Sequence, residues 1–462
     1  MRAPSLTARA LTLRAGILPA LAANHPDRYP VLLDSAAQGA LAQASVLAAF
    51  PRASLWCEAD GTLASSPPQL AAQCPPGQGF LDVLAGWLEA EKDPAPDELG
   101  LPFRGGWLVY LAYEMAEQIE ARLRLPRGEH LTAFALRVPM AVVALADGRA
   151  FLIVEPDVPP AQVEQLLADL ANEPVPAAPA PIGILAVDEE EPERFKTRVR
   201  RAQDYIRAGD VYQANLSRPW QVSLAPGTRV ADLYGQLRRA NPAPFAALAQ
   251  FRDLTLLSSS PERLLRIRDG RIDTRPIAGT HPRGATPEED QALAAALLAH
   301  PKERAEHIML IDLERNDLGR ICQGGSVRVD EYMGVETYAH VHHIVSNVTG
   351  LMRPELGAVD ALRAVFPGGT ITGCPKLRCM QIIAELEQQA RGVYTGSLGY
   401  INRDGSADFN ILIRTMSLSG NRISFRAGAG IVADSDAERE LKETRSKARG
   451  MMLALGMAAP RA

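Results

Sequence analysis

The sequence predicts an α+β fold, because strand-like runs occur on both sides of a proline- and alanine-rich linker and amphipathic helical segments lie among them. Short apolar runs bounded by Gly or Pro, which are typical of strands, fill much of residues 11–153. Residues 173–182 read E-P-V-P-A-A-P-A-P-I, which is the composition of a linker. We therefore divide the chain into a strand-rich part (1–172), a linker (173–182) and a C-terminal part (183–462).

Local patterns predict the individual elements. The runs Y-P-V-L-L (29–33) and G-G-W-L-V-Y (105–110) are read as strands, and residues 161–170 as a short helix. After the linker, an amphipathic helix over 192–208 ends at Gly209. The remaining predictions are strands at 211–216, 254–268, 338–350, 394–401 and 407–416, and a helix at 377–388 after the glycine-rich run F-P-G-G-T-I-T-G-C-P-K (366–376).

The composition excludes several classes of function. Of 462 residues, 47% are hydrophobic and 22% charged, as in an ordinary globular protein. A net charge of −5 with no basic stripe argues against a nucleic-acid-binding protein. We expect reduced thiols in the cytoplasm and neither a signal peptide nor a membrane span, because no C-x-x-C spacing or long apolar run occurs. The cysteines are Cys57, Cys74, Cys322, Cys374 and Cys379.

A stretch near the C-terminus, residues 426–447, holds the first candidate site. A β-prone run leads into G-A-G at residues 428–430, which we expect to form a turn whose backbone N–H groups bind an anion. In the helical segment that follows, Glu440 and Glu443 share a face and Lys447 lies one turn further on. Two carboxylates on one face repel each other unless a cation lies between them.

A second pair of acidic residues occurs upstream, where Glu303 and Glu306 in K-E-R-A-E-H repeat the same spacing. Two such pairs facing each other would supply the oxygen ligands that Mg²⁺ favours. Taken alone, either pair is better explained as the solvated face of a helix. The glycine segment, the lysine and the two pairs together favour a metal and anion site.

Six motifs in this order carry a resemblance to a known family. They are G-D-V-Y-Q-A-N-L (209–216), S-P-E-R (260–263), P-I-A-G-T (276–280), K-E-R-A-E-H (302–307), F-P-G-G-T-I-T-G-C-P-K (366–376) and A-G-A-G-I-V-A-D-S (427–435). From about residue 195 onward the chain resembles the chorismate-utilising enzymes, which include anthranilate synthase and aminodeoxychorismate synthase components I and the isochorismate and salicylate synthases. The resemblance implies two packed antiparallel β-sheets with surrounding helices, and an active site in the C-terminal part.

The same resemblance implies a magnesium ion that holds the ring carboxylate of chorismate. By motif position, Glu306 and Glu443 resemble the direct ligands, and Glu303 and Glu440 resemble their water-bridged partners. Lys447 resembles a lysine that pairs with that carboxylate, and Tyr394 and Arg414 match positions that hold the enolpyruvyl carboxylate, for which the fork of an arginine is suited. The implied substrate-binding residues are Gly279, Thr370, Tyr394, Arg414, Gly428, Ala429, Gly430 and Lys447.

Glu262, in S-P-E-R, matches the acid that protonates the departing C4 hydroxyl, a role that requires a raised pKa. His343 resembles the family histidine beside the substrate ring. His340 and His342 are interpreted as surface or satisfied core histidines, because no Asp or Cys lies nearby to form a metal site with them. The implied catalytic residues are Glu262, His343, Gln213 and Thr280.

Gln213 bears on which reaction is expected. Isochorismate and salicylate synthases carry a lysine at this position as the base that activates water, whereas a side-chain amide has no titratable base. This favours a member of the family that uses ammonia. The motifs around Asn215, F-P-G-G-T-I-T-G, V-H-H-I-V-S and D-F-N-I-L-I-R-T resemble aminodeoxychorismate synthase component I, which makes 4-amino-4-deoxychorismate on the route to 4-aminobenzoate and folate.

Ala278 departs from that pattern. The better-known aminodeoxychorismate synthases have a lysine here, proposed to attack C2, whereas anthranilate synthases have the P-I-A-G-T found in this chain. Alanine offers no nucleophile. Either ammonia or water attacks C2 first, or the product is anthranilate with pyruvate.

A partner and a second ligand follow from the same resemblance. The chain has no G-x-C-x-G nucleophile elbow, so ammonia would come from a separate glutamine amidotransferase subunit. The run containing Leu33, Asp34 and Ser35 resembles the L-L-E-S-A stretch with which anthranilate synthases bind tryptophan, and Pro244 and Phe245 resemble the second wall of that pocket. An ordinary buried strand end is the alternative for this run.

Two other classes of protein share part of this pattern. Residues 428–433 also satisfy G-x-G-x-x-A, but a dinucleotide-binding unit requires a further strand and an acidic residue, whereas the region beyond Arg449 is read as helix. A non-catalytic chorismate-binding regulatory subunit is the second alternative. Loss of a metal glutamate or of Glu262 would have favoured it, and all of them are present.

Overall fold

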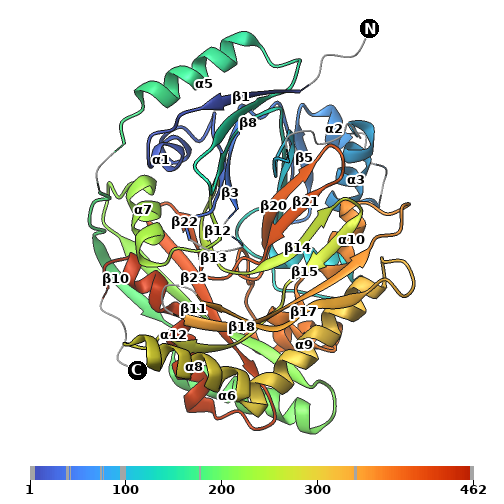
Figure 1. Cartoon of the computed structure of the whole chain (residues 1–462). Helices are drawn as coiled ribbons and strands as arrows, with labels where there is room; N and C mark the ends of the chain where they lie inside the picture. Colours follow the sequence, from blue (N-terminus) through green and yellow to red (C-terminus); the bar gives the residue numbers. More distant parts are fainter. Residues whose placement is uncertain are drawn as a thin grey trace.

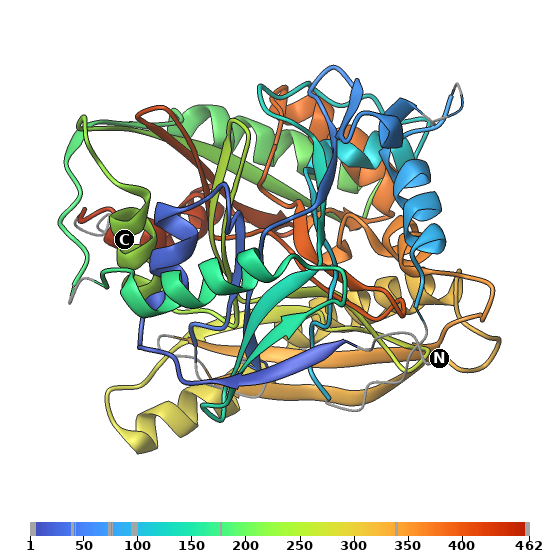
Figure 2. The same cartoon turned by 90° about the horizontal axis from the view of Figure 1, so that it is seen from above.

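Two β-sheets pack face to face at the centre of the molecule, and helices cover their outer faces (Figures 1 and 2). The computed structural model describes residues 6–457 apart from 38–40, 42, 73, 74, 76, 94–99, 176, 177 and 338–340. Every strand pairing described within these sheets is antiparallel, from β1 with β9 to β8 with β9. The prediction of an α+β fold with two packed antiparallel sheets is therefore confirmed.

The first sheet contains strands from along the whole chain. In spatial order its strands are β1 (Thr7–Leu11), β9 (Ala150–Val154), β8 (Met140–Leu145), β3 (Ala44–Ala49), β2 (Val31–Asp34), β12 (Phe245–Phe251), β13 (Leu254–Ser260), β22 (Thr415–Ser419), β23 (Arg422–Ile431), β11 (Gln213–Leu224) and β10 (Ile184–Glu189), with β19 (Gly373–Cys374) also paired to β11.

The second sheet also contains strands from both sides of the linker. In spatial order its strands are β16 (Ile277–Pro282), β18 (Val341–Leu351), β15 (Arg271–Thr274), β14 (Arg263–Arg268), β21 (Ala407–Asn410), β20 (Ser397–Asn402), β6 (Gly106–Leu111), β7 (Ala133–Val138), β4 (Ala53–Cys57) and β5 (Leu63–Ser66), with β17 (Arg328–Thr337) also paired to β18.

Helices lie outside both sheets. In Figure 1, α1, α5 and α7 lie at the left, α2, α3 and α10 at the right, and α6, α8, α9 and α12 toward the bottom. The helices are α1 (Ile17–Asn24), α2 (Gln69–Ala72), α3 (Phe80–Ala90), α4 (Ala116–Ile119), α5 (Pro160–Asn172), α6 (Pro192–Arg207), α7 (Val230–Ala240), α8 (Pro287–Ala299), α9 (Pro301–Gly319), α10 (Ala358–Val365), α11 (Lys376–Glu387) and α12 (Ala437–Ala454), with short 3₁₀ turns η1 (Tyr113–Met115) and η2 (Gly369–Ile371).

The parts on either side of the linker share both sheets. In the first sheet β2 pairs with β12, and in the second β6 pairs with β20, so each sheet joins a block of N-terminal strands to a block of C-terminal strands. The linker is itself held by side chains: Asn24 donates to Glu173 Oε1 at 2.7 Å, and the Ala180 N–H donates to Asp232 Oδ1 at 2.8 Å. The two parts therefore build one composite unit.

Alternation along the strands sorts the core into layers. Because successive side chains of a strand point to opposite faces, Val46 and Leu108 pack between the sheets. Leu47 and Leu248 face the opposite way, toward α1, α7 and α12. Val109 packs on the outer face of the second sheet, with α3 and α10. The central part of each sheet is thus buried on both faces.

Two of the places where the chain crosses between the sheets lie side by side. Strand β13 of the first sheet is followed, after two residues that end in Glu262, by β14 of the second sheet. Strand β21 of the second sheet is followed, after residues 411–414, by β22 of the first. The Ile411 N–H donates to the Glu262 carbonyl at 3.0 Å, and the Ser259 N–H donates to the Arg414 carbonyl at 3.1 Å. Glu262 and Arg414 therefore lie at the junction of the two sheets.

The turn predicted at residues 428–430 is wrong, because these residues are part of the long strand β23. Gly430 pairs with Asn215 and Gly428 with Ser217 of β11. A Cβ at Gly428 would lie 2.7 Å from the Leu216 carbonyl oxygen, so the missing side chains permit close packing inside a strand. The helix predicted after this segment is present as α12.

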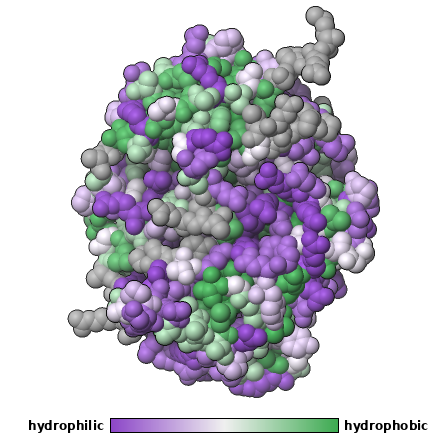
Figure 3. Space-filling view, in the orientation of Figure 1, coloured by the Kyte–Doolittle hydropathy of each residue, from purple (hydrophilic) through white to green (hydrophobic). Residues whose placement is uncertain are grey.

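Hydrophilic residues dominate the middle of the face drawn in Figure 3, and hydrophobic residues occur there in small groups. Within the part of the chain that the structure describes, no helix combines the length and the apolar composition needed to cross a bilayer.

We expect Leu248→Ala to lower the free energy of unfolding by about 2–5 kcal/mol, because the substitution leaves a cavity in the layer between the first sheet and its helices. Chemical denaturation measures this change. Leu185→Ala is the control, because Leu185 is 68% exposed. Its free energy of unfolding should change by no more than about 0.5 kcal/mol. Equal effects of the two substitutions would contradict this assignment of the core.

Candidate active site

Glu262 is a buried carboxyl group at the junction of the two sheets. Its side chain is 5% exposed, and Thr370 Oγ1 donates to Glu262 Oε1 at 2.7 Å. Burial raises the pKa of Glu262 to about 7, although Thr370, Lys447 and Arg414 act to lower it. A carboxylic acid with a pKa near 7 can donate a proton to a leaving group at neutral pH.

His343, in β18, is a neutral side chain near the same cations. Burial lowers the pKa of His343 to about 3, and the charges of Arg414 and Lys447 lower it further. Its Nδ1 lies 3.3 Å from the Gly279 carbonyl oxygen. Because a carbonyl only accepts hydrogen bonds, Nδ1 carries the proton of the neutral ring. His343, Glu262, Arg414 and Lys447 thus belong to one electrostatic environment.

A bulge in β16 brings α9 close to this environment. The register between β16 and β18 shifts at Gly279, between Ala278 and Thr280. Gly279 has a φ of +63°, and a Cβ there would lie 2.9 Å from Glu303 Oε2. Only glycine accommodates both this backbone and this neighbour. Thr280 continues β16, and its side chain lies outside the part that the structure describes.

Strand β23 presents its glycines to polar side chains. A Cβ at Gly428 would lie 2.7 Å from the Tyr394 hydroxyl and 2.8 Å from Asn215 Oδ1, and one at Gly430 would lie 2.2 Å from Gln213 Nε2. Among the described residues, Gln213 Oε1 and Asn215 Oδ1 are buried without a hydrogen-bond partner. Because an unsatisfied buried acceptor destabilises a fold, these atoms are suited to a ligand that satisfies them.

The other residues of this region differ in their surroundings. Ala429, between the two glycines, packs into a small apolar cluster with Leu216 and Phe195. His342 is a satisfied core histidine, as predicted: its Nε2 lies 2.8 Å from Asp290 Oδ1, and its Nδ1 lies 2.9 Å from Thr337 Oγ1. The prediction for His340 falls outside the described residues.

The four predicted metal ligands lie on two helices, with Glu303 and Glu306 on α9 and Glu440 and Glu443 on α12. Glu443 Oε1 lies 2.7 Å from Lys447 Nζ, and although burial opposes the charge of the lysine, Glu443 raises its pKa. Carboxylate oxygens are the ligands that Mg²⁺ favours, so the donor chemistry fits that ion. Among the described side chains, no group of three or more His, Cys, Asp or Glu residues is close enough together to hold a metal. The magnesium site therefore stays a prediction.

A comparison with known protein families shows to which of them the chain belongs. Residues 64–453 match the family described as chorismate binding enzyme. The chain belongs to this family.

Relatives of this chorismate-binding enzyme carry more than one name. The chain is 40% identical over 372 residues, which are 77% of this chain and 73% of the relative, to an anthranilate synthase component I-like protein of Synechocystis sp.. It is 49% identical over 261 residues, 56% of this chain and 55% of the relative, to aminodeoxychorismate synthase component 1 of Bacillus subtilis. The crystal structure of anthranilate synthase component I from Streptococcus pneumoniae matches with a TM-score of 0.78 and 34% identity, over 90% of this chain and 93% of that one. The family is established, and the relatives' names leave the product open.

A cavity of about 400 Å³, within the size range of small-molecule sites, is lined in part by residues of β14 and β20. Leu33, Asp34, Pro244 and Phe245 line it, as the sequence predicted for a tryptophan pocket. Ser35 makes other contacts: its N–H donates to Ser45 Oγ at 3.0 Å, and its hydroxyl lies 3.5 Å from the Pro244 carbonyl oxygen. The remaining lining residues include Leu101, Arg104, Arg263 and Tyr400.

Asp34 is fully engaged within the protein. The Tyr234 hydroxyl donates to Asp34 Oδ2 at 2.9 Å, Arg238 Nε donates to the same oxygen at 2.5 Å, and Ser45 donates to Oδ1 at 3.1 Å. Its carboxylate thus ties α7 to β2 and to β3.

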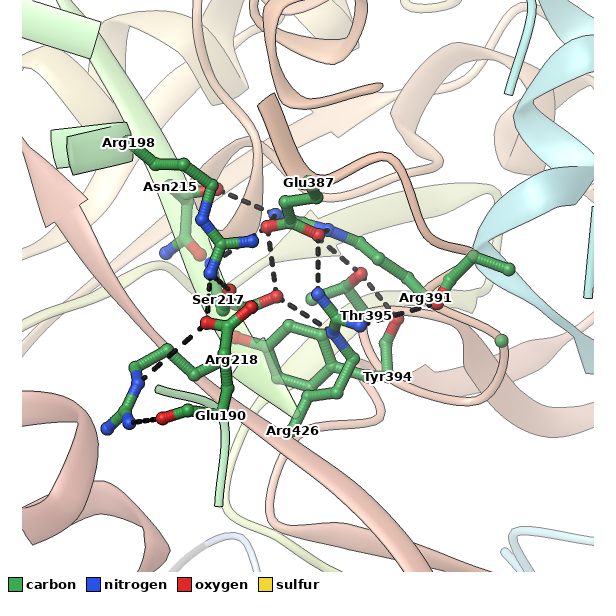
Figure 4. A network of polar contacts seen from close by, with 12 residues as sticks. Glu190, Arg198, Asn215, Ser217, Arg218, Glu387, Arg391, Tyr394, Thr395 and Arg426 are labelled. Atoms are coloured by element: carbon green, nitrogen blue, oxygen red, sulfur yellow. Dashed lines mark hydrogen bonds and ion pairs between the residues drawn. The ribbon is translucent and has the colours of Figure 1, made fainter. Parts of the chain in front are cut away.

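The sequence did not predict two buried ion pairs near the site. Glu387 and Arg391 form an ion pair at 2.8 Å with each side chain 1% exposed (Figure 4). Asp317 pairs with Lys376 at 2.5 Å behind the loop that carries Thr370. A Glu and an Arg four residues apart are usually a surface pair on a helix, so the sequence alone contained no signal that these side chains are buried.

We expect Glu262→Gln to stabilise the protein at pH 8 but not at pH 4. An acid whose pKa rises from 4.5 to about 7 on folding holds its proton more tightly in the folded state, so the fold loses stability as the pH rises through that interval. Glutamine has no proton to lose, and the difference at pH 8 is on the order of 3 kcal/mol.

Thermal denaturation of both proteins between pH 4 and pH 8.5 measures this difference. A gap in Tm that stays the same at every pH would contradict a raised pKa at Glu262.

Proposed function

We propose that the protein catalyses the Mg²⁺-dependent amination of chorismate to 4-amino-4-deoxychorismate, on the route to 4-aminobenzoate and folate. The observation that carries this proposal is the buried Glu262 at the junction of the sheets, whose pKa is raised to about 7. The charges of Arg414 and Lys447 act on Glu262 and on the neutral His343 alike. In the net reaction, ammonia replaces the C4 hydroxyl, which leaves as water. Glu262 supplies the proton that turns this hydroxyl into a good leaving group.

The positions of the polar residues support a substrate with two carboxylates. Lys447 and the open edge of β23 are assigned to the ring carboxylate, since β23 pairs with β22 only over residues 422–425 but with β11 up to Ile431. Tyr394 and Arg414 are assigned to the enolpyruvyl carboxylate. Mg²⁺, when bound by Glu306 and Glu443 with Glu303 and Glu440 behind them, would neutralise the ring carboxylate.

Gln213 supports amination over addition of water. Gln213 is 7% exposed, and its side chain faces Gly430. A lysine at position 213 could act as a base. An amide cannot remove a proton from water at neutral pH. Ammonia is itself a nucleophile and needs no such base.

Anthranilate synthase is the second candidate, and Ala278 is the observation that favours it. Ala278 is 8% exposed in β16 beside the bulge at Gly279, and it provides no amine to attack C2. In our proposal, ammonia attacks C2 as the C4 hydroxyl leaves as water, and a second ammonia then bonds to C4 as the amine at C2 departs as ammonia. A non-catalytic chorismate-binding subunit is a third possibility, which the absence of turnover would favour.

The proposal includes a partner and a compartment. Ammonia is supplied by a glutamine amidotransferase subunit, because the sequence has no nucleophile elbow for hydrolysing glutamine. We place the enzyme in the cytoplasm. In support, the described cysteines, Cys57, Cys322, Cys374 and Cys379, are all free thiols.

We propose that a tryptophan molecule binds in the cavity of about 400 Å³. The apolar residues Leu33, Pro244 and Phe245 offer a surface for the indole ring.

Purified protein with chorismate, Mg²⁺ and ammonium is expected to form 4-amino-4-deoxychorismate, detected as 4-aminobenzoate only after a lyase is added. Fluorescent anthranilate and pyruvate without added lyase would instead establish the second candidate. Glu306→Gln should abolish turnover, and Glu262→Gln should lower it by about 10²–10⁴-fold.

Two controls accompany this assay. Glutamine in place of ammonium should give no product until an amidotransferase subunit is added. Chorismate left untouched by the wild-type protein with abundant ammonia would refute catalysis.

Calorimetry is expected to detect tryptophan binding to the wild-type protein, and Phe245→Ala should weaken it by removing one wall of the cavity. Phenylalanine serves as the matched ligand control. The absence of both heat and thermal stabilisation with tryptophan would leave the cavity without this ligand.

A further inference from the structure

A buried network of charges lies behind the proposed substrate site, and none of the roles assigned above uses it (Figure 4). Its centre is Glu387, which is 1% exposed at the end of α11. Arg391 Nη2 donates to Glu387 Oε1 at 2.8 Å and Arg391 Nε to Oε2 at 3.1 Å. Arg426 Nη2 donates to Oε2 at 2.8 Å. One carboxylate therefore holds two arginines from different elements.

Arg391 reaches three segments of the proposed site. Its Nη2 donates to the Asn215 carbonyl at 2.7 Å, and its Nη1 donates to the Ile371 carbonyl at 3.1 Å. Its guanidinium carbon lies 5.6 Å from the centre of the Tyr394 ring. These contacts belong to β11, to the loop that carries Thr370, and to the turn before β20.

Glu387 also holds the strands that carry the glycines. The Ser217 N–H and hydroxyl donate to Glu387 Oε1 at 2.8 and 3.0 Å. Arg426 Nε donates to Ser217 Oγ at 3.0 Å. Ser217 pairs with Gly428 across the β11 and β23 ladder, and Arg426 precedes Gly428 by two residues in β23. Glu387 thus holds one side chain from each of these paired strands beside the site.

The network is permanently charged. Burial opposes ionisation of Glu387, but Arg391 and Arg426 outweigh it and lower its pKa to about 2. Removing charges from water is costly, so a buried ion network adds little stability beyond what apolar side chains of the same volume would provide. Its specific effect is on geometry. A side chain that makes several hydrogen bonds has one arrangement that satisfies all of its partners, so its position is fixed.

We propose that Glu387 and Arg391 are positioning residues for chorismate, which hold Tyr394, the Thr370 loop and the β11 and β23 pair at the spacing that the substrate requires. This role rests on the proposed function, since it assumes that the substrate lies against these segments. Neither residue touches the substrate. They act through Tyr394 and through the backbone of the two strands.

The test compares Glu387→Gln and Arg391→Lys with a matched pair elsewhere. Both variants keep the approximate volume, but Glu387→Gln removes the charge that joins the arginines, and Arg391→Lys removes the fork that reaches Asn215 and Ile371. The control is Glu155→Gln. Glu155 is a buried partner of Arg137, with two hydrogen bonds of 2.8 and 2.7 Å in the N-terminal part of the chain.

We expect KM for chorismate to rise by about 10–100-fold in both variants, with kcat changed much less, because a misplaced site weakens substrate binding before it alters the chemistry. Glu155→Gln should lower Tm and leave KM unchanged. Unchanged KM in Glu387→Gln and Arg391→Lys, or an equal rise in the control, would overturn the proposal and leave the network a purely structural one.

Two measurements separate this inference from the proposed function. Chorismate disappearance is followed rather than any one product, so the result is the same whether 4-amino-4-deoxychorismate or anthranilate forms. The Kd of chorismate is also measured by calorimetry. If the wild-type protein bound chorismate without turnover, the proposed function would fail, while a raised Kd in both variants would still support positioning.

Discussion

The double crossing of the chain between the two sheets is the constraint on which the rest of this structure depends. The crossing at Glu262 and the crossing at 411–414 are joined by backbone hydrogen bonds, so neither can shift without the other. They bring Glu262 and Arg414 to the junction, where both sheets bury the carboxyl group. The raised pKa of Glu262 follows from that burial, since apolar surroundings disfavour the charged form.

Two buried glutamates show that neighbouring residues can shift the pKa of the same chemical group in opposite directions. The cations near Glu262 only partly offset its burial, so its pKa rises to about 7 and its protonated form is well populated at neutral pH. Glu387 is bonded directly to two arginines, so its pKa falls to about 2 and the group stays ionised. The first is suited to give away a proton and the second to hold other residues in place.

Most of the glycines near the site allow other side chains to approach the backbone closely, and do not form turns. Gly428 and Gly430 lie in a regular strand, where their missing side chains leave room for Tyr394 and Gln213. Gly279 is different, because its φ of +63° allows a bulge that places β16 against Glu303. Sequence patterns alone do not separate these two uses, which is why a turn was predicted where β23 is continuous.

The sequence by itself determined the fold class, most element positions and the family, because strand alternation, helix-ending residues and motif spacing are local properties of the chain. The motifs around Glu262 and His343 were sufficient to single out these two residues. Only the tertiary structure decided that strands from both sides of the linker share each sheet, that burial raises the pKa of Glu262, and that Glu387 and Arg391 are buried. The physical reason is that burial and pairing depend on residues far apart in sequence, such as Ser217 and Glu387, and no local pattern encodes which distant segments meet.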